Sequence, residues 1–198
     1  MFTLFIWPRI RRENFQKIVV KGKLTKLEVV PSWEEPTPDT KHIFIYPAQA
    51  FGTGDHETTN LCLEFIIDEL SKKVEKRILD FGCGSGILGI AASEFNIDVV
   101  DLYDIDPESI KNTELNIDHN KHLKSINSCR VLSKKSEIGK KYDFIFANIL
   151  LNTLVEFKDE FTDLLPHDGK LLVSGLLKEQ TGLFMEKYGD KFSILDTK

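Results

Sequence analysis

Short apolar runs alternate with amphipathic segments along most of this chain. Apolar residues recur at helical spacing between residues 58 and 71. Residues 77–81 and 143–147, in contrast, are short and almost continuously apolar, as strands buried on both faces are. This alternation predicts an α/β fold with a mostly parallel, doubly wound sheet and helices on both of its faces. The predicted strands are 24–30, 43–46, 77–81, 99–104, 128–132, 143–147, 170–174 and 192–196, and the predicted helices are 58–71, 87–94, 107–116, 152–165 and 178–188.

A proline-rich stretch near the N-terminus is typical of a linker. It covers residues 32–41 and separates the first predicted strand from the rest. We therefore divide the chain into a short N-terminal segment with its linker, residues 1–41, and a main domain, residues 42–198. A chain of 198 residues is long enough for one domain with a substantial core.

Composition and charge narrow the function classes. The hydrophobic share of 41% and charged share of 29% are those of an ordinary globular protein. The net charge of −5 argues against a broad nucleic-acid-binding surface, although residues 9–26 are locally basic, either as a solvated face or as a patch. No apolar run reaches the roughly 20 residues of a membrane span, so no membrane association is expected. Cys62, Cys83 and Cys129 lack metal-ligand spacing, which indicates reduced thiols in a cytoplasmic protein.

The stretch from Asp80 to Asp104 carries the strongest chemical signal. The predicted strand 77–81 runs into a glycine-rich turn and a helix, and the next strand ends on Asp104. Glycines allow a sharp turn and close approach to a ligand, and a helix start presents free N–H groups. Asp104, 20 positions after the second glycine, is placed to accept both ribose hydroxyls of a nucleoside. The glycines of the turn are Gly82, Gly84 and Gly86.

Two kinds of nucleoside cofactor fit such a turn. The run Gly84-Ser-Gly-Ile-Leu-Gly89 satisfies the dinucleotide pattern G-x-G-x-x-G, but its first glycine lies three residues past Phe81 instead of directly after the strand. The pattern that begins at the strand end is Asp-x-Gly-x-Gly-x-Gly with Asp80 at its head, which resembles motif I of the class I S-adenosylmethionine-dependent methyltransferases. A carboxylate there suits a cofactor with a sulfonium and an ammonium, whereas it would repel a pyrophosphate. No Gly-Lys-Ser/Thr follows, so a P-loop is excluded.

Two further segments place polar residues ahead of predicted helices. The segment Ala50-Phe-Gly-Thr-Gly-Asp-His-Glu-Thr-Thr59 contains His56. It is either a glycine loop that closes over a cofactor or a surface turn with a helix cap. The strand 143–147 leads to Asn148, at the edge of a doubly wound sheet where ligands bind. Its amide can bind the cofactor, orient an incoming amine, or do both, and the alternative is a simple cap of the next helix.

Together these segments resemble the ribosomal protein L11 methyltransferase (PrmA-type) family. The resemblance runs from about Lys26 to Asp196 and is most specific in the Phe-Gly-Thr-Gly-x-His-x-Thr-Thr and Ala-Asn-Ile-Leu stretches. The matching motifs are Pro31-Ser-Trp33, Ala50-Phe-Gly-Thr-Gly-x-His-x-Thr-Thr59, Asp80-Phe-Gly-Cys-Gly-Ser-Gly-Ile-Leu88, Asp104-Ile-Asp-Pro107, Ala147-Asn-Ile-Leu150 and Ser174-Gly-Leu-Leu-x-x-Gln180.

The resemblance implies a Rossmann-like class I methyltransferase fold over residues 42–198, with S-adenosyl-L-methionine as the cofactor. The implied reaction is methyl transfer to amines of a ribosomal protein, both lysine side chains and the N-terminal amine. By the same resemblance the cofactor contacts are Thr59, Gly82, Asp104 and Asn148, and Asp80, Gly84 and Gly86 shape the same turn.

The sequence also departs from the family pattern. The family carries a separate N-terminal domain that grips the substrate, so residues 1–41 are expected to be a remnant of that region. The chain stops at Lys198, and the sheet would then lack its last, antiparallel strand unless another chain supplies it, which leaves an oligomer open. The alternatives are a methyltransferase for another protein or a small molecule, or an inactive remnant that binds the cofactor.

The implied chemistry needs a neutral amine. A lysine with a pKa of about 10.4 is neutral in roughly one molecule per few thousand at pH 7, so the site must desolvate the amine or remove its proton. His56 is the candidate base, and Asn148 is the candidate for orienting the lone pair. His119 and His122 have no third ligand nearby, so no metal is expected.

Overall fold

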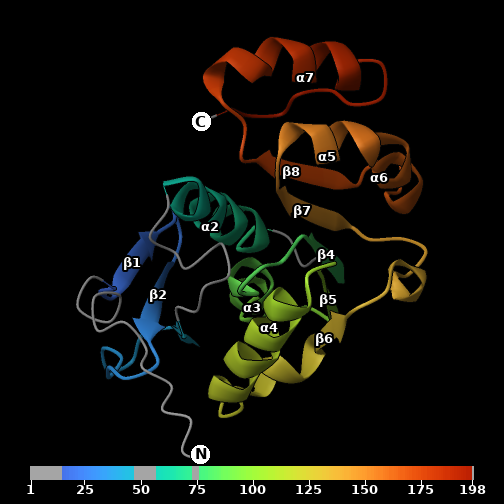
Figure 1. The fold of residues 1–198 in the computed structure, drawn as a ribbon. Helices are drawn as coiled ribbons and strands as arrows, with labels where there is room; N and C mark the ends of the chain where they lie inside the picture. The colour runs from blue at the N-terminus through green and yellow to red at the C-terminus, as the bar shows by residue number, and fades with distance from the viewer. Residues whose placement is uncertain (1–14, 47–56, 73–75, 198) are drawn as a thin grey trace, which may run out of the picture.

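The computed structural model describes residues 15–46, 57–72 and 76–197, and these form two sheets with helices packed around them (Figure 1). A three-stranded sheet lies at the N-terminal end, and a five-stranded sheet forms the centre of the molecule. None of the helices in these ranges has both the length and the apolar character that crossing a bilayer would require.

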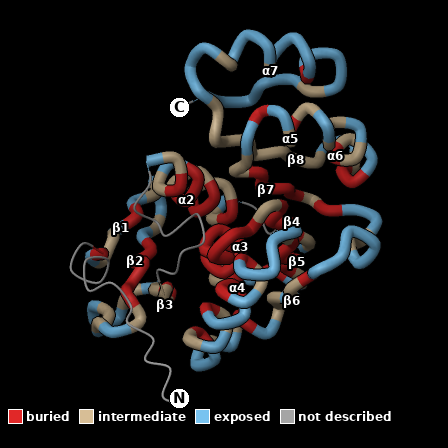
Figure 2. Tube along the Cα trace, in the orientation of Figure 1, coloured by how far each residue is buried: buried red, intermediate tan, exposed pale blue. Residues whose placement is uncertain are grey.

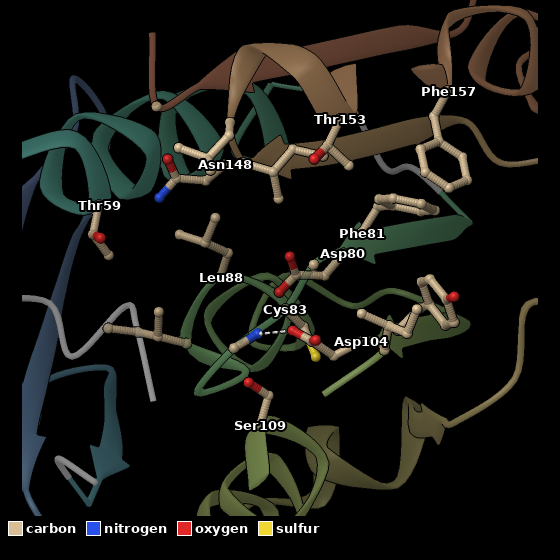
Figure 3. Close-up of a pocket in the computed structure, with 18 of the residues that line it drawn as sticks. Thr59, Asp80, Phe81, Cys83, Leu88, Asp104, Ser109, Asn148, Thr153 and Phe157 are labelled. Atoms are coloured by element: carbon tan, nitrogen blue, oxygen red, sulfur yellow. Dashed lines mark hydrogen bonds between the residues drawn. The ribbon is translucent and has the colours of Figure 1, made fainter. Parts of the chain in front are cut away.

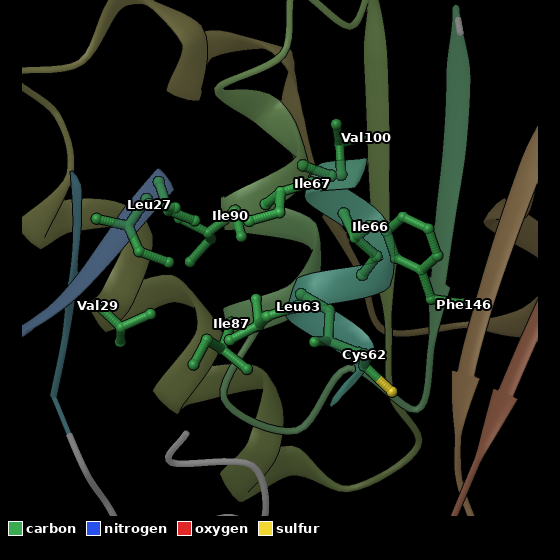
Figure 4. Close-up of a cluster of buried hydrophobic side chains, with 14 of the residues drawn as sticks. Leu27, Val29, Cys62, Leu63, Ile66, Ile67, Ile87, Ile90, Val100 and Phe146 are labelled. Atoms are coloured by element: carbon green, nitrogen blue, oxygen red, sulfur yellow. The ribbon is translucent and has the colours of Figure 1, made fainter. Parts of the chain in front are cut away.

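The N-terminal sheet packs its apolar face on a long helix. Strand β1 (Ile18–Lys21) pairs antiparallel with β2 (Lys26–Pro31), and β2 pairs in parallel with β3 (His42–Ile45). Side chains from β2 join those of helix α2 (Glu57–Leu70) and of the helix that follows the glycine turn in one apolar cluster (Figure 4). The division of the chain at residue 41 stays a prediction, and the strands on either side of it pair in one sheet.

The outer edge of β3 is closed by asparagine side chains. Asn120 accepts a hydrogen bond from the Phe44 N–H (2.8 Å) and donates one to the Phe44 carbonyl (2.7 Å). Asn116 accepts from the Tyr46 N–H at 2.7 Å. Their amides supply the donors and acceptors that a neighbouring strand would otherwise supply.

The central sheet is parallel throughout and has the order β6-β5-β4-β7-β8. The first strand in sequence, β4, lies in the middle, and the chain adds strands first on one side of it and then on the other. Such a reversal opens a crevice at the carboxyl ends of the strands on either side of the switch, which is where ligands bind in open α/β sheets. The strands are β4 (Arg77–Phe81), β5 (Val99–Tyr103), β6 (Cys129–Leu132), β7 (Phe144–Asn148) and β8 (Lys170–Ser174).

Helices cover both faces of this sheet, and successive strand residues point to opposite sides. Ile78 joins the cluster under α2 and α3, whereas Leu79 joins the cluster under α5 and α6. All seven residues of α3 are buried, and α7 is largely exposed (Figure 2). The helices on the first face are α2, α3 (Ile87–Ser93) and α4 (Pro107–His119), and those on the second are α5 (Leu151–Glu156), α6 (Lys158–Leu164) and α7 (Thr181–Tyr188). Short 3-10 turns cover Lys124–Ser128, Lys135–Glu137 and Lys178–Gln180.

Two predicted elements were wrong, and one strand was not predicted. The single helix 152–165 is two helices that meet at Phe157, whose backbone (φ −95°, ψ 9°) interrupts the helical repeat. Residues 192–196 form no strand; Ile194 and Leu195 are 51% and 77% exposed, and within the described ranges no strand pairs with this segment. Strand β1 was not predicted, because Val20 is its one fully buried residue and lysine ends it.

Candidate functional site

A pocket of about 680 Å³ opens at the carboxyl ends of β4, β5 and β7. It lies at the point where the strand order reverses. Thr59 and Asn148 stand on one side, Phe81 and Phe157 on the other, and Asp80 lies between them (Figure 3). The residues that line it are Thr59, Asp80, Phe81, Gly82, Cys83, Gly84, Ile87, Leu88, Tyr103, Asp104, Ile105, Ser109, Asn148, Ile149, Leu150, Thr153, Glu156, Phe157 and Gly175.

The glycine turn forms the floor of the pocket. Gly82 has a φ of +75°, and a Cβ there would lie 2.4 Å from Ile149 Cγ2, so only glycine fits. Helix α4 fixes the turn from below, because Thr113 Oγ1 donates to the Gly84 carbonyl (3.0 Å) and Asn116 Nδ2 donates to the Ser85 carbonyl (2.8 Å). The turn is thereby held rigidly against the next strand and helix.

Gly86 has a different role from its neighbours. It caps α3 with a φ of +77° and is not among the residues that line the pocket. A Cβ there would lie 2.9 Å from Thr113 Cγ2 and 3.2 Å from Leu102 Cδ2. Gly86 therefore allows close packing of α3 on α4 and β5.

Asp104 follows β5 and is fixed by two backbone donors. Its Oδ2 accepts from the Gly84 N–H at 2.9 Å (Figure 3), and its Oδ1 accepts from the Asp106 N–H at 2.9 Å. A carboxylate has about four acceptor positions, so each oxygen keeps a lone pair for a ligand hydroxyl. This is the arrangement that a ribose diol requires.

Asp80 is buried deeper, at 1% exposure, and lines the same pocket. Its Oδ2 accepts from the Gly89 N–H in the first turn of α3 at 2.9 Å. Burial raises the pKa of this carboxyl to about 7, and the Asp104 carboxylate nearby adds to the rise. The described lining residues include three carboxylates, those of Asp80, Asp104 and Glu156, and no lysine, arginine or histidine. Such a pocket favours a cationic ligand and disfavours a pyrophosphate.

Thr59 and Asn148 each present a polar atom without a partner. Thr59 Oγ1 and Asn148 Oδ1 are buried and make no hydrogen bond within the described part of the chain. A buried polar atom left unpaired costs about 1–3 kcal/mol, which a ligand with matching groups recovers. Gly175 gives Asn148 its room, because a Cβ at that position would lie 3.4 Å from Asn148 Oδ1 and 2.8 Å from the Ile149 carbonyl.

The structure thus brings together most of the predicted site residues. Thr59, Asp80 and Asn148 converge on the pocket with Gly82, Gly84 and Asp104. His56 and residues 50–56 of its loop lie outside the described residues. Among the described residues no group of three side chains could hold a metal ion.

Sequence reasoning missed the apolar walls of the pocket. Ile105 and Leu150 line it while 85% and 74% exposed, and Thr153 and Phe157 extend the lining along α5 and the residue that follows it. Ile105 directly follows Asp104, and Leu150 lies two residues after Asn148. This closeness in sequence to the polar residues at the strand ends could have predicted that both side chains line the pocket. An apolar pair of this kind suits the faces of a flat base.

The parallel sheet with this strand order, its glycine turn after the central strand and an acidic residue at the end of the next define a class I methyltransferase fold. The chain belongs to the ribosomal protein L11 methyltransferase (PrmA) family, whose model matches residues 7–198. The predicted fold class and family are therefore confirmed.

Individual relatives agree with this assignment. The chain is 35% identical over 193 residues to a ribosomal protein L11 methyltransferase of Legionella pneumophila (strain Corby), covering 96% of this chain and 64% of that protein. It is 35% identical over 189 residues to the protein of that name from Marinomonas sp. (strain MWYL1), covering 95% and 62%. The chain thus spans somewhat less than two thirds of the length of these relatives. The crystal structure of a ribosomal protein L11 methylase from Lactobacillus delbrueckii subsp. bulgaricus superimposes with a TM-score of 0.75 at 28% identity, covering 89% of each chain.

Proposed function

We propose that this chain is an S-adenosyl-L-methionine-dependent methyltransferase that methylates amines, on lysine side chains or the N-terminus, of a ribosomal protein. The observation that carries the proposal is the pocket at the strand switch, with its three carboxylates, its lack of a described cationic side chain and its two unpaired buried polar atoms. A ligand with a ribose, a flat base and positive charge matches these features together.

In this proposal, different residues of the pocket bind different parts of the cofactor. The Asp104 carboxylate, held by Gly84 and Asp106, accepts hydrogen bonds from the ribose hydroxyls. Ile105 and Leu150 provide apolar surface for the base. Asp80 provides the negative charge for the cationic amino-acid part. When bound, the cofactor supplies a methyl group on a sulfonium that needs no further activation.

The protein's own task is then to position the amine. Asn148 Oδ1 accepts a hydrogen bond from the amine N–H and so aims the nitrogen lone pair at the methyl group. Thr59 Oγ1, also unpaired, can hold the cofactor on the same side of the pocket. His56 as the base that removes the amine proton stays a prediction, since it lies outside the described residues.

The names of the relatives indicate which protein accepts the methyl group. Both curated relatives and the solved structure are named for ribosomal protein L11. We infer that a ribosomal protein of this kind is the methyl acceptor, and that the reaction takes place in the cytoplasm, where ribosomes are assembled. Because the relatives are longer than this chain, the activity of the whole protein is part of the proposal.

The first test is isothermal titration of the purified chain with S-adenosylmethionine, with NAD as the control ligand. Saturable binding of S-adenosylmethionine alone is expected. The Asp104→Ala variant is expected to bind it at least about 150-fold more weakly, because two charge-assisted hydrogen bonds of at least about 1.5 kcal/mol each are lost. Binding of NAD instead, or unchanged affinity in Asp104→Ala, would contradict the assignment of the ribose.

The second test is methyl transfer from labelled cofactor to purified ribosomal protein L11. The Asn148→Ala variant is expected to lower kcat by about 10²-fold or more while the cofactor Kd changes less, because orientation contributes mainly at the transition state. A loss confined to cofactor affinity would remove the orienting role from Asn148. Cofactor binding without transfer to this protein would favour another acceptor or an inactive domain.

A further inference from the structure

We propose that His42 and His122 form a binding site for a late transition-metal ion such as Zn²⁺, away from the cofactor pocket. The two residues are 80 positions apart in the chain and lie on β3 and just after α4. Neither of them lines the pocket at the strand switch. The site is therefore independent of the proposed methyl transfer, and its failure would leave that function standing.

The two imidazole rings approach each other through their Nε2 atoms, which lie 3.4 Å apart. The ring planes differ by 14°, and the ring centroids are 5.6 Å apart. Zinc binds an imidazole nitrogen at about 2.0–2.1 Å, so two such nitrogens at neighbouring corners of a tetrahedron lie about 3.3–3.4 Å apart. The separation of the two nitrogens thus matches the edge of a zinc coordination tetrahedron.

A second contact fixes the tautomer of His42. Its Nδ1 lies 3.0 Å from the Thr40 carbonyl oxygen, which can only accept a hydrogen bond, so Nδ1 carries the proton. Nε2 of His42 therefore presents a lone pair towards His122. Thr40 is itself held in a turn, because its Oγ1 donates to the Thr37 carbonyl at 2.6 Å. Metal-binding histidines in proteins are oriented in the same way, by donation from the other ring nitrogen.

His122 is the adjustable half of the site. Its side chain is exposed, and its Nε2–H donates to the His42 lone pair. A metal ion takes the place of that proton when the His122 ring passes to its other tautomer, with the proton on Nδ1, and turns its own Nε2 lone pair to the ion. Phe44 packs edge-on against both rings, at 5.3 Å between centroids in each case, and so keeps the pair together.

The charges around the pair do not oppose a cation. The lysine next to each histidine is paired with a carboxylate, since Lys41 lies 3.9 Å from Glu94 and Lys121 forms an ion pair with Asp118. Among the described residues no third side chain completes a metal site, so water fills the remaining coordination positions. Imidazole ligands favour zinc, nickel or copper, whereas Mg²⁺ and Ca²⁺ prefer oxygen ligands.

His119 provides a matched control within the chain. It lies three positions before His122, and this spacing is what would pair the two histidines in the sequence alone. In the structure the His119 ring stacks on Tyr46 instead, with centroids 6.1 Å apart and planes that differ by 17°. A site made by His42 and His122 therefore depends on the fold and does not need His119.

Calorimetric titration of the tag-free chain with ZnCl₂ at pH 7.5 tests the site, with MgCl₂ as the control. We expect saturable binding of Zn²⁺ and none of Mg²⁺. His122→Ala and His42→Gln should each weaken Zn²⁺ binding at least about tenfold, because each removes one of the two protein ligands. His119→Ala should leave the affinity unchanged. No saturable binding of Zn²⁺, unchanged affinity in His122→Ala, or an equal loss in His119→Ala would overturn the proposal.

Cu²⁺ reports the ligands directly. The electron paramagnetic resonance spectrum of the chain with one equivalent of Cu²⁺ should show coupling to two imidazole nitrogens, and that of His122→Ala coupling to one. Because His122 is exposed, its replacement should leave the circular dichroism spectrum unchanged, which separates loss of a ligand from loss of the fold. The same nitrogen coupling in both proteins would overturn the assignment to His122.

Discussion

Asp80 and Asp101 lie on neighbouring central strands, and both are inaccessible to solvent, at 1% and 0% exposure. The register pairs Asp80 with Leu102 and Leu79 with Asp101, so the two carboxyls point to opposite faces of the sheet. They share residue type, burial and sheet, and differ in what surrounds them.

Side chains of the same protein donate several hydrogen bonds to the Asp101 carboxylate. Arg130 donates to it through Nε and Nη2 at 2.7 Å each, and the Tyr142 hydroxyl donates at 2.6 Å. The Arg77 guanidinium lies 3.8 Å away. Burial raises the pKa of Tyr142 to about 12, and its hydrogen bond to Asp101 adds to the rise. Asp80, within the described residues, has one backbone donor and faces another carboxylate. Burial alone therefore does not mark a functional carboxyl; an incomplete set of donors inside a pocket does.

The largest change in stability is expected from replacing Asp101, the carboxylate whose hydrogen-bond donors are all supplied by the protein. Asp101→Asn should lower the free energy of unfolding by about 3–4 kcal/mol, because the guanidinium pairs and the tyrosine hydroxyl lose a buried charged acceptor. Urea denaturation at pH 7 measures this. Asp98→Asn, at the exposed turn before the same strand, is the control and should change the value by less than about 0.5 kcal/mol. Equal losses in the two variants would contradict the comparison.

Removing the charge of Asp80 is expected to stabilise the protein, whereas Asp101→Asn destabilises it. The pKa of the Asp80 carboxyl is near 3.9 in the unfolded chain and about 7 in the folded protein, so the free energy of unfolding falls as the pH rises between these values. Asp80→Asn removes that loss, so its stability relative to the unchanged protein should increase from pH 4.5 to 7.5. The full shift corresponds to about 4 kcal/mol, and water entering the open pocket reduces the expected gain to about 2 kcal/mol. Thermal unfolding across this pH range measures it, and a relative stability that fell with pH would contradict the raised pKa.

The smallest change in stability is expected from removing one of the hydrogen bonds to Asp101. Tyr142→Phe removes the hydroxyl that donates to Asp101 and accepts from the Gly139 N–H at 2.7 Å. We expect a loss of about 1 kcal/mol, because the guanidinium bonds remain. A double-mutant cycle with Asp101→Asn should give a coupling energy of similar size. A coupling near zero would show that the hydroxyl contributes nothing to holding the carboxylate.

The elements that could be predicted from the sequence are those that depend on neighbouring residues in the chain. Strand 77–81 and the glycine turn were predicted correctly, because continuous apolar residues and closely spaced glycines leave few alternatives. Asp104 and Asn148 were placed at strand ends, and parallel strands bring such ends to one edge. Thr59 comes from a distant segment, and its place in the pocket follows from the family motif rather than from periodicity.

The features that escaped prediction depend on distant partners. The bonds to Asp101 come from Arg130 and Tyr142, 29 and 41 positions away, and nothing in the strand 99–104 marks them. The break at Phe157 is not visible in the apolar spacing, because α5 and α6 bury their apolar side chains in the same cluster. Segment 192–196 has strand-like composition, but a strand requires a partner edge, and composition does not supply one.

The asparagine-closed edge of β3 has a consequence for how the molecule opens. The amide protons of Phe44 and Tyr46 are bonded to Asn120 and Asn116, 76 and 70 positions away on or beside α4. Exchange of these protons with solvent deuterium therefore requires β3 and α4 to separate, whatever happens to the hairpin of β1 and β2. The two amides should be protected to the same degree as each other, and α4 should hold the third strand in place even when the first two fray.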